Sequence, residues 1–187
     1  MKTKVMILGS KSKLKILEKC DLPIIVDGNI IPHFNSTKHL GIHLSTNLTW
    51  DDHVAQLSRK VFGVLKSLKH KRNILSTSTR KLLVTSTILL IIDYCSFVLL
   101  DSSKRLDNKL QRLINIAIRF ILNLKCDVHI TPHRHSLNWL NIKSRQSYFL
   151  ACFFYKLLAT GEPKFLRALF RDEDPDIRRS DRLASKQ

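Results

Sequence analysis

The chain has 187 residues, the length of one domain of ordinary size. Its 32 Lys and Arg outnumber its 15 Asp and Glu, so the formal charge is +17, and 44% of the residues are apolar. These values exclude a disordered or collagen-like chain. The five glycines and five prolines are too few for an all-β sandwich or barrel, so the composition favours long helices.

The positive charge is concentrated in one part of the chain. Between Asp52 and Asp93 there are eight Lys or Arg and no carboxylate, whereas five of the 15 acidic residues lie in the last 16 positions. Lys and Arg release counterions when they contact phosphates, so this pattern indicates a polyanionic partner. A solvated basic surface without a partner is the alternative.

The first 48 residues are predicted to form a small β element. Residues 4–9 are predicted to be a strand and residues 10–19 a loop. Within residues 23–32, β-branched side chains flank Asp27-Gly28, a dipeptide that favours a tight hairpin turn. A further short strand is predicted over residues 39–44.

From Thr49 onward, apolar residues recur at helical spacing. In the helix after residue 103, the predicted core face consists of Leu106, Leu110, Leu113, Ile114, Ala117 and Ile121. Thr49 is predicted to cap the first helix. The predicted helices cover about 49–72, 76–93, 103–121, 132–138, 143–160 and 163–170, and a polar tail follows over 172–187. We therefore expect an α+β fold that is mainly α, with a small N-terminal antiparallel β element followed by a helical bundle.

Other classes of site have weak support. Cys126, His129, His133 and His135 could bind zinc, although Pro132 interrupts the run. The pair Asp51-Asp52 could bind magnesium, but its place at a helix start has a capping explanation.

Membrane and secretory signals are also weak. The apolar run 82–100 is long enough to span a membrane, but Asp93 lies inside it, so we expect a buried helix instead. With four widely spaced cysteines and no secretory signal, we expect reduced thiols in an intracellular chain, cytoplasmic or nuclear, without a membrane partner.

A series of short segments carries a more specific signal through its order. The segments are Lys2-Thr3-Lys4-Val5-Met6, Lys38-His39-Leu40-Gly41-Ile42-His43-Leu44, Leu48-Thr49-Trp50-Asp51-Asp52-His53-Val54, Ile92-Asp93-Tyr94-Cys95, residues 110–119, and residues 137–142 with Arg145. Over about residues 2–170 this series resembles the C-terminal part of the reverse transcriptases of non-LTR (LINE-type) retrotransposons, the jockey-like group especially.

The resemblance implies a role for each part of the chain. Residues 1–48 would be a remnant of the palm, in which Lys2 matches the lysine after the catalytic aspartates. Lys38, Leu40 and Gly41 would match the hairpin that grips the primer strand. Residues 49–171 would correspond to the thumb and connecting helices. The magnesium-binding aspartates of the family lie upstream, and no Tyr/Phe-x-Asp-Asp occurs in these residues.

The resemblance therefore implies a fragment of an RNA-directed DNA polymerase that binds a primer–template duplex of RNA and DNA but does not polymerise alone. The missing N-terminal part of the polymerase would be a further partner, and no cofactor is expected in this chain. The alternatives are a non-enzymatic helical interaction protein, which would dock on an acidic protein, and a non-functional retroelement remnant.

Two basic helix faces are candidates for the phosphate contacts. Arg59, Lys66 and His70 would form one stripe along the first helix, and Gly63 would let the backbone approach the duplex closely. Arg112 and Arg119 would form a second stripe on the helix after residue 103. Such contacts would read charge and shape, since phosphates carry no base information. For each residue, solvation on the outside of a bundle is the alternative.

Overall fold

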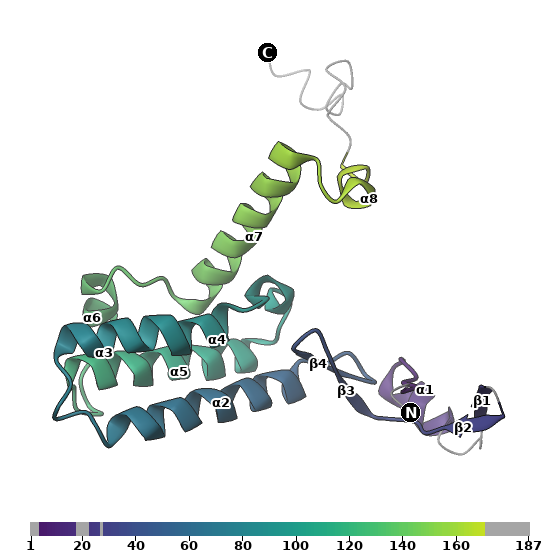
Figure 1. The fold of residues 1–187 in the computed structure, drawn as a ribbon, viewed down its shortest axis with the longest axis horizontal. Helices are drawn as coiled ribbons and strands as arrows, with labels where there is room; N and C mark the ends of the chain where they lie inside the picture. Colours follow the sequence, from purple (N-terminus) through teal and green to yellow (C-terminus); the bar gives the residue numbers. More distant parts are fainter. Residues whose placement is uncertain (1–3, 18–22, 27, 171–187) are drawn as a thin grey trace, which may run out of the picture. The chain divides into compact units, whose positions relative to one another are not determined.

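The structure is a computed structural model that describes residues 4–17, 23–26 and 28–170. It is an α+β fold, mainly α, in which small antiparallel hairpins precede a helical region (Figure 1). The chain falls into two compact units, residues 1–147 and residues 148–187. The helical region predicted over 49–171 therefore extends into both units, and the predicted tail over 172–187 lies outside the described residues.

The N-terminal part contains the predicted first hairpin and one unexpected helix. Strands β1 (Ile24–Val26) and β2 (Asn29–Ile31) pair antiparallel, as Asp27-Gly28 predicted. The strand expected over 4–9 is reduced to a single parallel bridge between Val5 and His33. Helix α1 (Lys11–Leu17) replaces the expected loop, because the Ser10 hydroxyl accepts a hydrogen bond from the Lys13 backbone N–H at 3.4 Å and caps the helix.

A second hairpin stands where one short strand was expected. Strands β3 (Ser36–His39) and β4 (Ile42–Ser45) pair antiparallel around a turn at Leu40 and Gly41. Both turn residues have positive φ, 46° and 85°, which is the conformation of a two-residue hairpin turn. The prediction of a continuous strand over 39–44 was wrong because the chain reverses at these two residues.

The helical bundle has one apolar core. Its elements are α2 (Asp51–Lys69), α3 (Thr77–Val84), a π-helical turn (Thr85–Leu89), α4 (Leu90–Asp93), a 3₁₀ turn (Ser96–Leu99) and α5 (Lys104–Leu122). The predicted apolar face of α5 is buried throughout, including Leu110, Ile114 and Ile121. Helix α5 packs against both α2 and α3. Because Arg105 pairs with Asp51 at one end, while Leu65 and Phe120 line one pocket at the other, α2 and α5 run in the same direction.

One helix start agrees with its predicted position, and one differs from the predicted cap. Helix α3 begins at Thr77, close to the predicted start at residue 76, and Ser76 caps it by accepting a hydrogen bond from the Thr79 N–H at 3.1 Å. At α2, Trp50 occupies the N-cap position without a side-chain hydrogen bond. The Thr49 hydroxyl bonds instead to the Asn47 side chain at 2.9 Å, so the prediction of a Thr49 cap was wrong.

The apolar run over 82–100 is divided between several elements. It passes through the end of α3, the π-helical turn and α4, then turns at Cys95, whose φ is +52°, into the 3₁₀ turn. Among the described residues, no helix combines the length and the apolar character needed to cross a membrane. The carboxylate of Asp93 inside the run is paired with Arg145, with one N–O distance of 2.7 Å.

The remaining helices follow the bundle in sequence. Helix α6 (Thr131–Ser136) has Pro132 in its first turn, as predicted, and α7 (Ile142–Thr160) ends before Gly161, whose φ is +68°. The start of α7, which belongs to the first unit, is held on the bundle. The Ile142 N–H donates to the Gln111 side chain at 2.9 Å, and the Lys143 ammonium lies 2.9 Å from the Asp107 carboxylate. Helix α8 (Lys164–Arg167) lies in the second unit.

Candidate nucleic-acid interface

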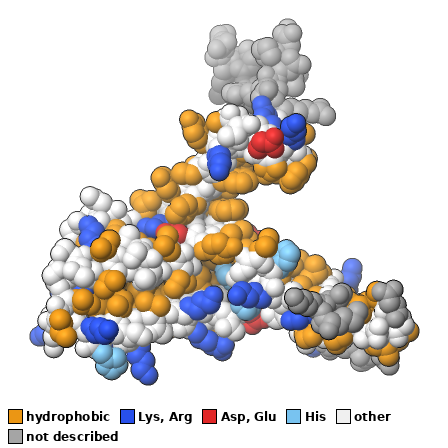
Figure 2. Space-filling view, in the orientation of Figure 1, with side chains coloured by type: hydrophobic (Ala, Val, Ile, Leu, Met, Phe, Trp, Pro, Cys, Tyr) orange, Lys and Arg blue, Asp and Glu red, His pale blue; other side chains and the backbone are white. Residues whose placement is uncertain are grey.

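The outer face of α2 is basic. Arg59, Lys66 and His70 are exposed and recur at intervals of seven and four residues, so they follow one side of the helix. The opposite side, including Val54 and Val61, is completely buried in the core. In the space-filling view, Lys and Arg side chains gather over the region where α2 runs (Figure 2). The structure thus places the first predicted stripe on solvent-exposed helix surface.

Gly63 lies in the middle of this stripe. It is exposed, and no heavy atom lies within 4 Å of the position that a Cβ would occupy. Packing within the chain therefore does not require glycine here, although glycine in a helix interior costs about 0.5–1 kcal/mol relative to alanine. The position leaves α2 backbone accessible between the side chains of the stripe.

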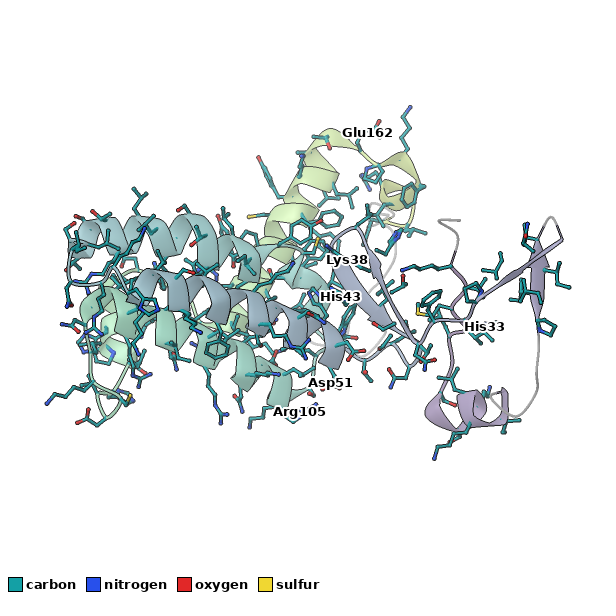
Figure 3. All side chains as sticks on the ribbon, turned by 60° about the horizontal axis from the view of Figure 1, so that its bottom comes forward. His33, Lys38, His43, Asp51, Arg105 and Glu162 are labelled. Carbon is teal, nitrogen blue, oxygen red and sulfur yellow. The ribbon has the colours of Figure 1, made fainter. Side chains whose placement is uncertain are left out.

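The basic face of α2 is not neutralised by the ion pairs of the bundle. Within residues 4–17, 23–26 and 28–170, the ion pairs join Asp51 to Arg105, Asp107 to Lys143, and Asp93 to Arg145. Figure 3 shows the first pair, which links the starts of α2 and α5. None of the three uses a cation of the α2 stripe. Cations without nearby carboxylates give the surface a positive potential, which attracts phosphates.

The two predicted residues on α5 have different environments. Arg112 is exposed. Arg119 is half-buried, and its guanidinium donates hydrogen bonds to the backbone carbonyls of Lys125, Cys126 and Val128 at 3.2–3.3 Å. It thereby holds the loop that follows α5. A phosphate contact by Arg119 stays a prediction, and it would have to share the guanidinium with these carbonyls.

Sequence reasoning missed two cations at the far end of the same face. Lys69 and Arg72 line a pocket of about 380 Å³ with Arg119, and the rest of its lining is apolar apart from Cys126. In the part of the chain that the structure describes, no Asp or Glu lines this pocket. The signal in the sequence was the continuation of the acid-free stretch beyond His70. Both residues share this pocket lining with Ile116, Arg119 and Phe120 of α5.

The residues implied by the resemblance lie on the second hairpin or outside the described part. Lys38 is exposed on β3, paired across the strands with His43. Gly41 packs against Tyr94, the residue that follows α4, so closely that a Cβ at position 41 would lie 2.9 Å from the Tyr94 ring. Lys2 lies outside the described residues.

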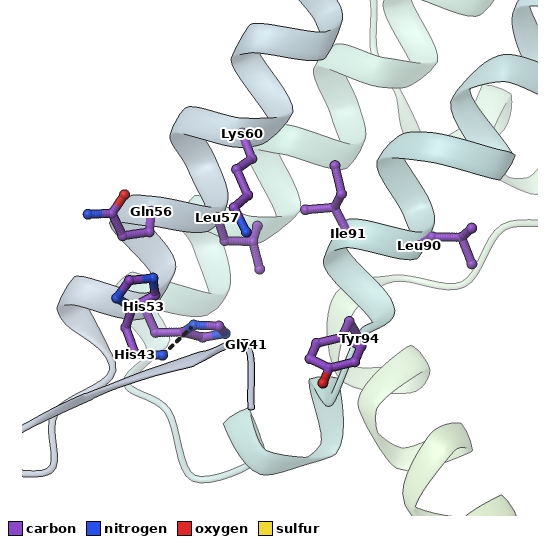
Figure 4. Close-up of a pocket in the computed structure, with 9 residues that line it drawn as sticks. All are labelled: Gly41, His43, His53, Gln56, Leu57, Lys60, Leu90, Ile91 and Tyr94. Atoms are coloured by element: carbon purple, nitrogen blue, oxygen red, sulfur yellow. Dashed lines mark hydrogen bonds between the residues drawn. The ribbon is translucent and has the colours of Figure 1, made fainter. Parts of the chain in front are cut away.

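A pocket of about 310 Å³ lies where this hairpin meets α2 and α4 (Figure 4). Its walls combine the side chains of Leu57, Leu90 and Ile91 with polar groups from His43, His53 and Lys60. None of the described residues that line it is acidic. Sequence analysis did not predict this pocket, because its walls come from segments about fifty residues apart whose approach depends on the turn at Gly41.

His53 is neutral at physiological pH. Its side chain is buried, and its Nδ1 accepts a hydrogen bond from the His43 backbone N–H at 3.3 Å, which requires an unprotonated Nδ1. Burial lowers the pKa of His53 below its ordinary 6.5, and the nearby His43 and Lys60 lower that pKa further. The imidazole therefore adds polarity to the pocket wall without adding charge.

The candidate zinc residues are not gathered into a site. Cys126, His129 and His135 are exposed on the loop and helix after α5. Across the described ranges, no three His, Cys, Asp or Glu side chains come together in a group that could hold a metal ion.

Comparisons of the chain with protein families, with curated proteins and with solved structures gave no match.

Proposed function

We propose that this chain binds nucleic-acid duplexes through the exposed basic face of α2, with the exposed Arg112 of α5 as a further phosphate contact. The observation that carries the proposal is the combination of an acid-free cationic stripe with a rigid, fully buried core directly beneath it. A rigid helix keeps the cations in fixed positions, so less conformational entropy is lost when they contact phosphates.

The resemblance extends this proposal to a biological role. The chain would be the duplex-holding part of a retrotransposon-derived RNA-directed DNA polymerase, with a primer–template duplex of RNA and DNA as its ligand. The sequence contains no Tyr/Phe-x-Asp-Asp, so the magnesium-dependent chemistry of that family would belong to another part of the polymerase. On the same proposal, the chain works in the cytoplasm or the nucleus.

The test is the salt dependence of binding to a fluorescent RNA–DNA duplex, measured by fluorescence anisotropy. The logarithm of the association constant should fall linearly with the logarithm of the salt concentration. The variant Arg59→Ala/Lys66→Ala should lower the steepness of that line by about 2, because each lost phosphate contact removes about one counterion.

A matched control removes the same charge elsewhere. Lys81→Ala/Lys156→Ala takes two cations from exposed helical positions outside the α2 stripe. It should leave the steepness close to that of the unchanged protein. An affinity that does not change with salt concentration would refute the proposed interface. So would an equal decrease of the slope in the two double variants.

A second candidate function, docking on a protein, is favoured by the first hairpin. Ile24, Ile25, Val26 and Ile30 are all exposed on β1 and β2, and a two-stranded hairpin alone is only marginally stable in water. The N-terminal part of a polymerase of that family is the partner that the resemblance implies. Protein binding of this kind should persist in the presence of heparin or RNA, whereas binding through the α2 stripe should be lost.

A further inference from the structure

We propose that the pocket between the β3–β4 hairpin, α2 and α4 receives one unstacked nucleotide of the nucleic acid bound on α2, with the base against Leu57, Leu90 and Ile91 and a phosphate at Lys60. This inference rests on the proposed function and deepens it. It assigns to the chain a contact with a base, in addition to the contacts with phosphates.

The pocket is formed before any ligand binds. The Tyr94 hydroxyl donates to the Leu40 carbonyl at 2.7 Å, and the His43 N–H donates to His53 at 3.3 Å. Gly41 fits against the Tyr94 ring without room for a side chain. These contacts fix the hairpin to both helices, so no ordering cost is added when a ligand enters.

The chemistry of the walls selects a flat, apolar body that carries a negative charge. Leu57, Leu90 and Ile91 supply the apolar surface, and among the described lining residues Lys60 supplies the one Lys, Arg, Asp or Glu side chain (Figure 4). His53, held neutral, adds no charge to the site. A heteroaromatic base with a phosphate fits this combination, whereas a cationic ligand would have no carboxylate to pair with.

Size and position point to a single nucleotide of a longer strand. The volume of about 310 Å³ lies near the lower end of the range of about 300–1,000 Å³ typical of small-molecule pockets, so it holds a small ring system. Lys60 follows Arg59 directly in α2, about 100° further around the helix. A strand whose phosphates contact Arg59 therefore passes beside the opening.

The test compares two duplexes that carry the same number of phosphates. One has a single unpaired nucleotide, and the other has an abasic residue at the same position. Anisotropy titrations should show the full chain binding the unpaired nucleotide about tenfold more tightly, because only this duplex can place a base on the apolar wall. A fully paired duplex should bind like the abasic one.

Two variants of equal charge locate the effect. Leu90→Glu places a carboxylate in the pocket wall, and Leu82→Glu places one at a similarly exposed position outside the pocket, where the leucine is 67% exposed against 62% for Leu90. Leu90→Glu should abolish the tenfold preference while keeping the salt-dependent binding of the abasic duplex. Leu82→Glu should keep the tenfold preference and the salt-dependent binding. Circular dichroism should show that the two variants are folded.

Each other outcome overturns a defined part of the proposal. Equal affinity for the two duplexes, or equal effects of the two variants, overturns the pocket and leaves the proposed function standing. Loss of salt-dependent binding to every duplex overturns the proposed function, and the pocket with it. If adenosine 5′-monophosphate alone binds in a manner that Leu90→Glu abolishes while the duplexes show no preference, the pocket takes free nucleotides and not a strand.

Discussion

The ion pair between Asp93 and Arg145 should stabilise the fold far more than the pair between Asp51 and Arg105. The two pairs join residues 52 and 54 positions apart, so both connect distant segments. They differ in burial, because the side chains of Asp93 and Arg145 are 13% and 14% exposed, whereas those of Asp51 and Arg105 are 48% and 72% exposed. Water screens the second pair much more than the first.

The substitution Asp93→Asn removes one charge and leaves the Arg145 guanidinium buried without its partner. Breaking a buried pair in this way costs about 3–5 kcal/mol, and the residual exposure places the expected loss near about 3 kcal/mol. The matched substitution Asp51→Asn should cost less than about 1 kcal/mol, because exposed pairs contribute little.

Urea unfolding followed by circular dichroism measures both losses. Each pair is studied as a double-mutant cycle, with Arg145→Gln and Arg105→Gln as the partner substitutions. The coupling energy should be about 2 kcal/mol for the pair with Arg145 and below about 0.5 kcal/mol for the pair with Arg105. Equal coupling energies in the two cycles would refute the argument from burial.

Two further predictions concern α2. Gly63→Ala should stabilise the protein by about 0.5–1 kcal/mol while weakening duplex binding, because the added methyl favours helix but blocks approach to the backbone. Urea unfolding and anisotropy measure the two effects, with Ser67→Ala as a control, and unchanged affinity would contradict the close approach. The lowered pKa of His53 predicts that stability falls as pH decreases from about 6.5 through the folded pKa, since the unfolded chain then binds the proton that the folded chain excludes. Urea midpoints between pH 5 and 7.5 should show this fall, His53→Gln should reduce it, and an unchanged pH profile in that variant would contradict the assignment.

The periodicity of the sequence predicted the bundle well because burial of one helix face leaves a local signature. Every apolar residue expected on the inner side of α5 is buried there. The first hairpin was predicted from Asp27-Gly28 for a similar reason, since the turn preference resides in two adjacent residues. Such features depend only on residues that are close together in the chain, so a single sequence is enough to predict them.

The features that sequence reasoning missed depend on contacts between distant segments. Arg119 has the spacing of a solvent-exposed cation, but the loop after α5 folds back and brings three carbonyls to its guanidinium. Asp93 was expected in a buried helix, but no local pattern identified Arg145 as its partner. The turn at Leu40 was missed because leucine rarely adopts positive φ, and there the contact with Tyr94 outweighs the local preference.

The fit of Gly41 against the Tyr94 ring couples these two positions in evolution. A side chain at position 41 would meet an aromatic ring 2.9 Å away, so it can be accepted only where a smaller residue replaces the tyrosine. That replacement also removes the hydroxyl that holds the Leu40 carbonyl. In any lineage of related chains, a residue other than glycine at 41 should therefore occur only where tyrosine at 94 has been replaced.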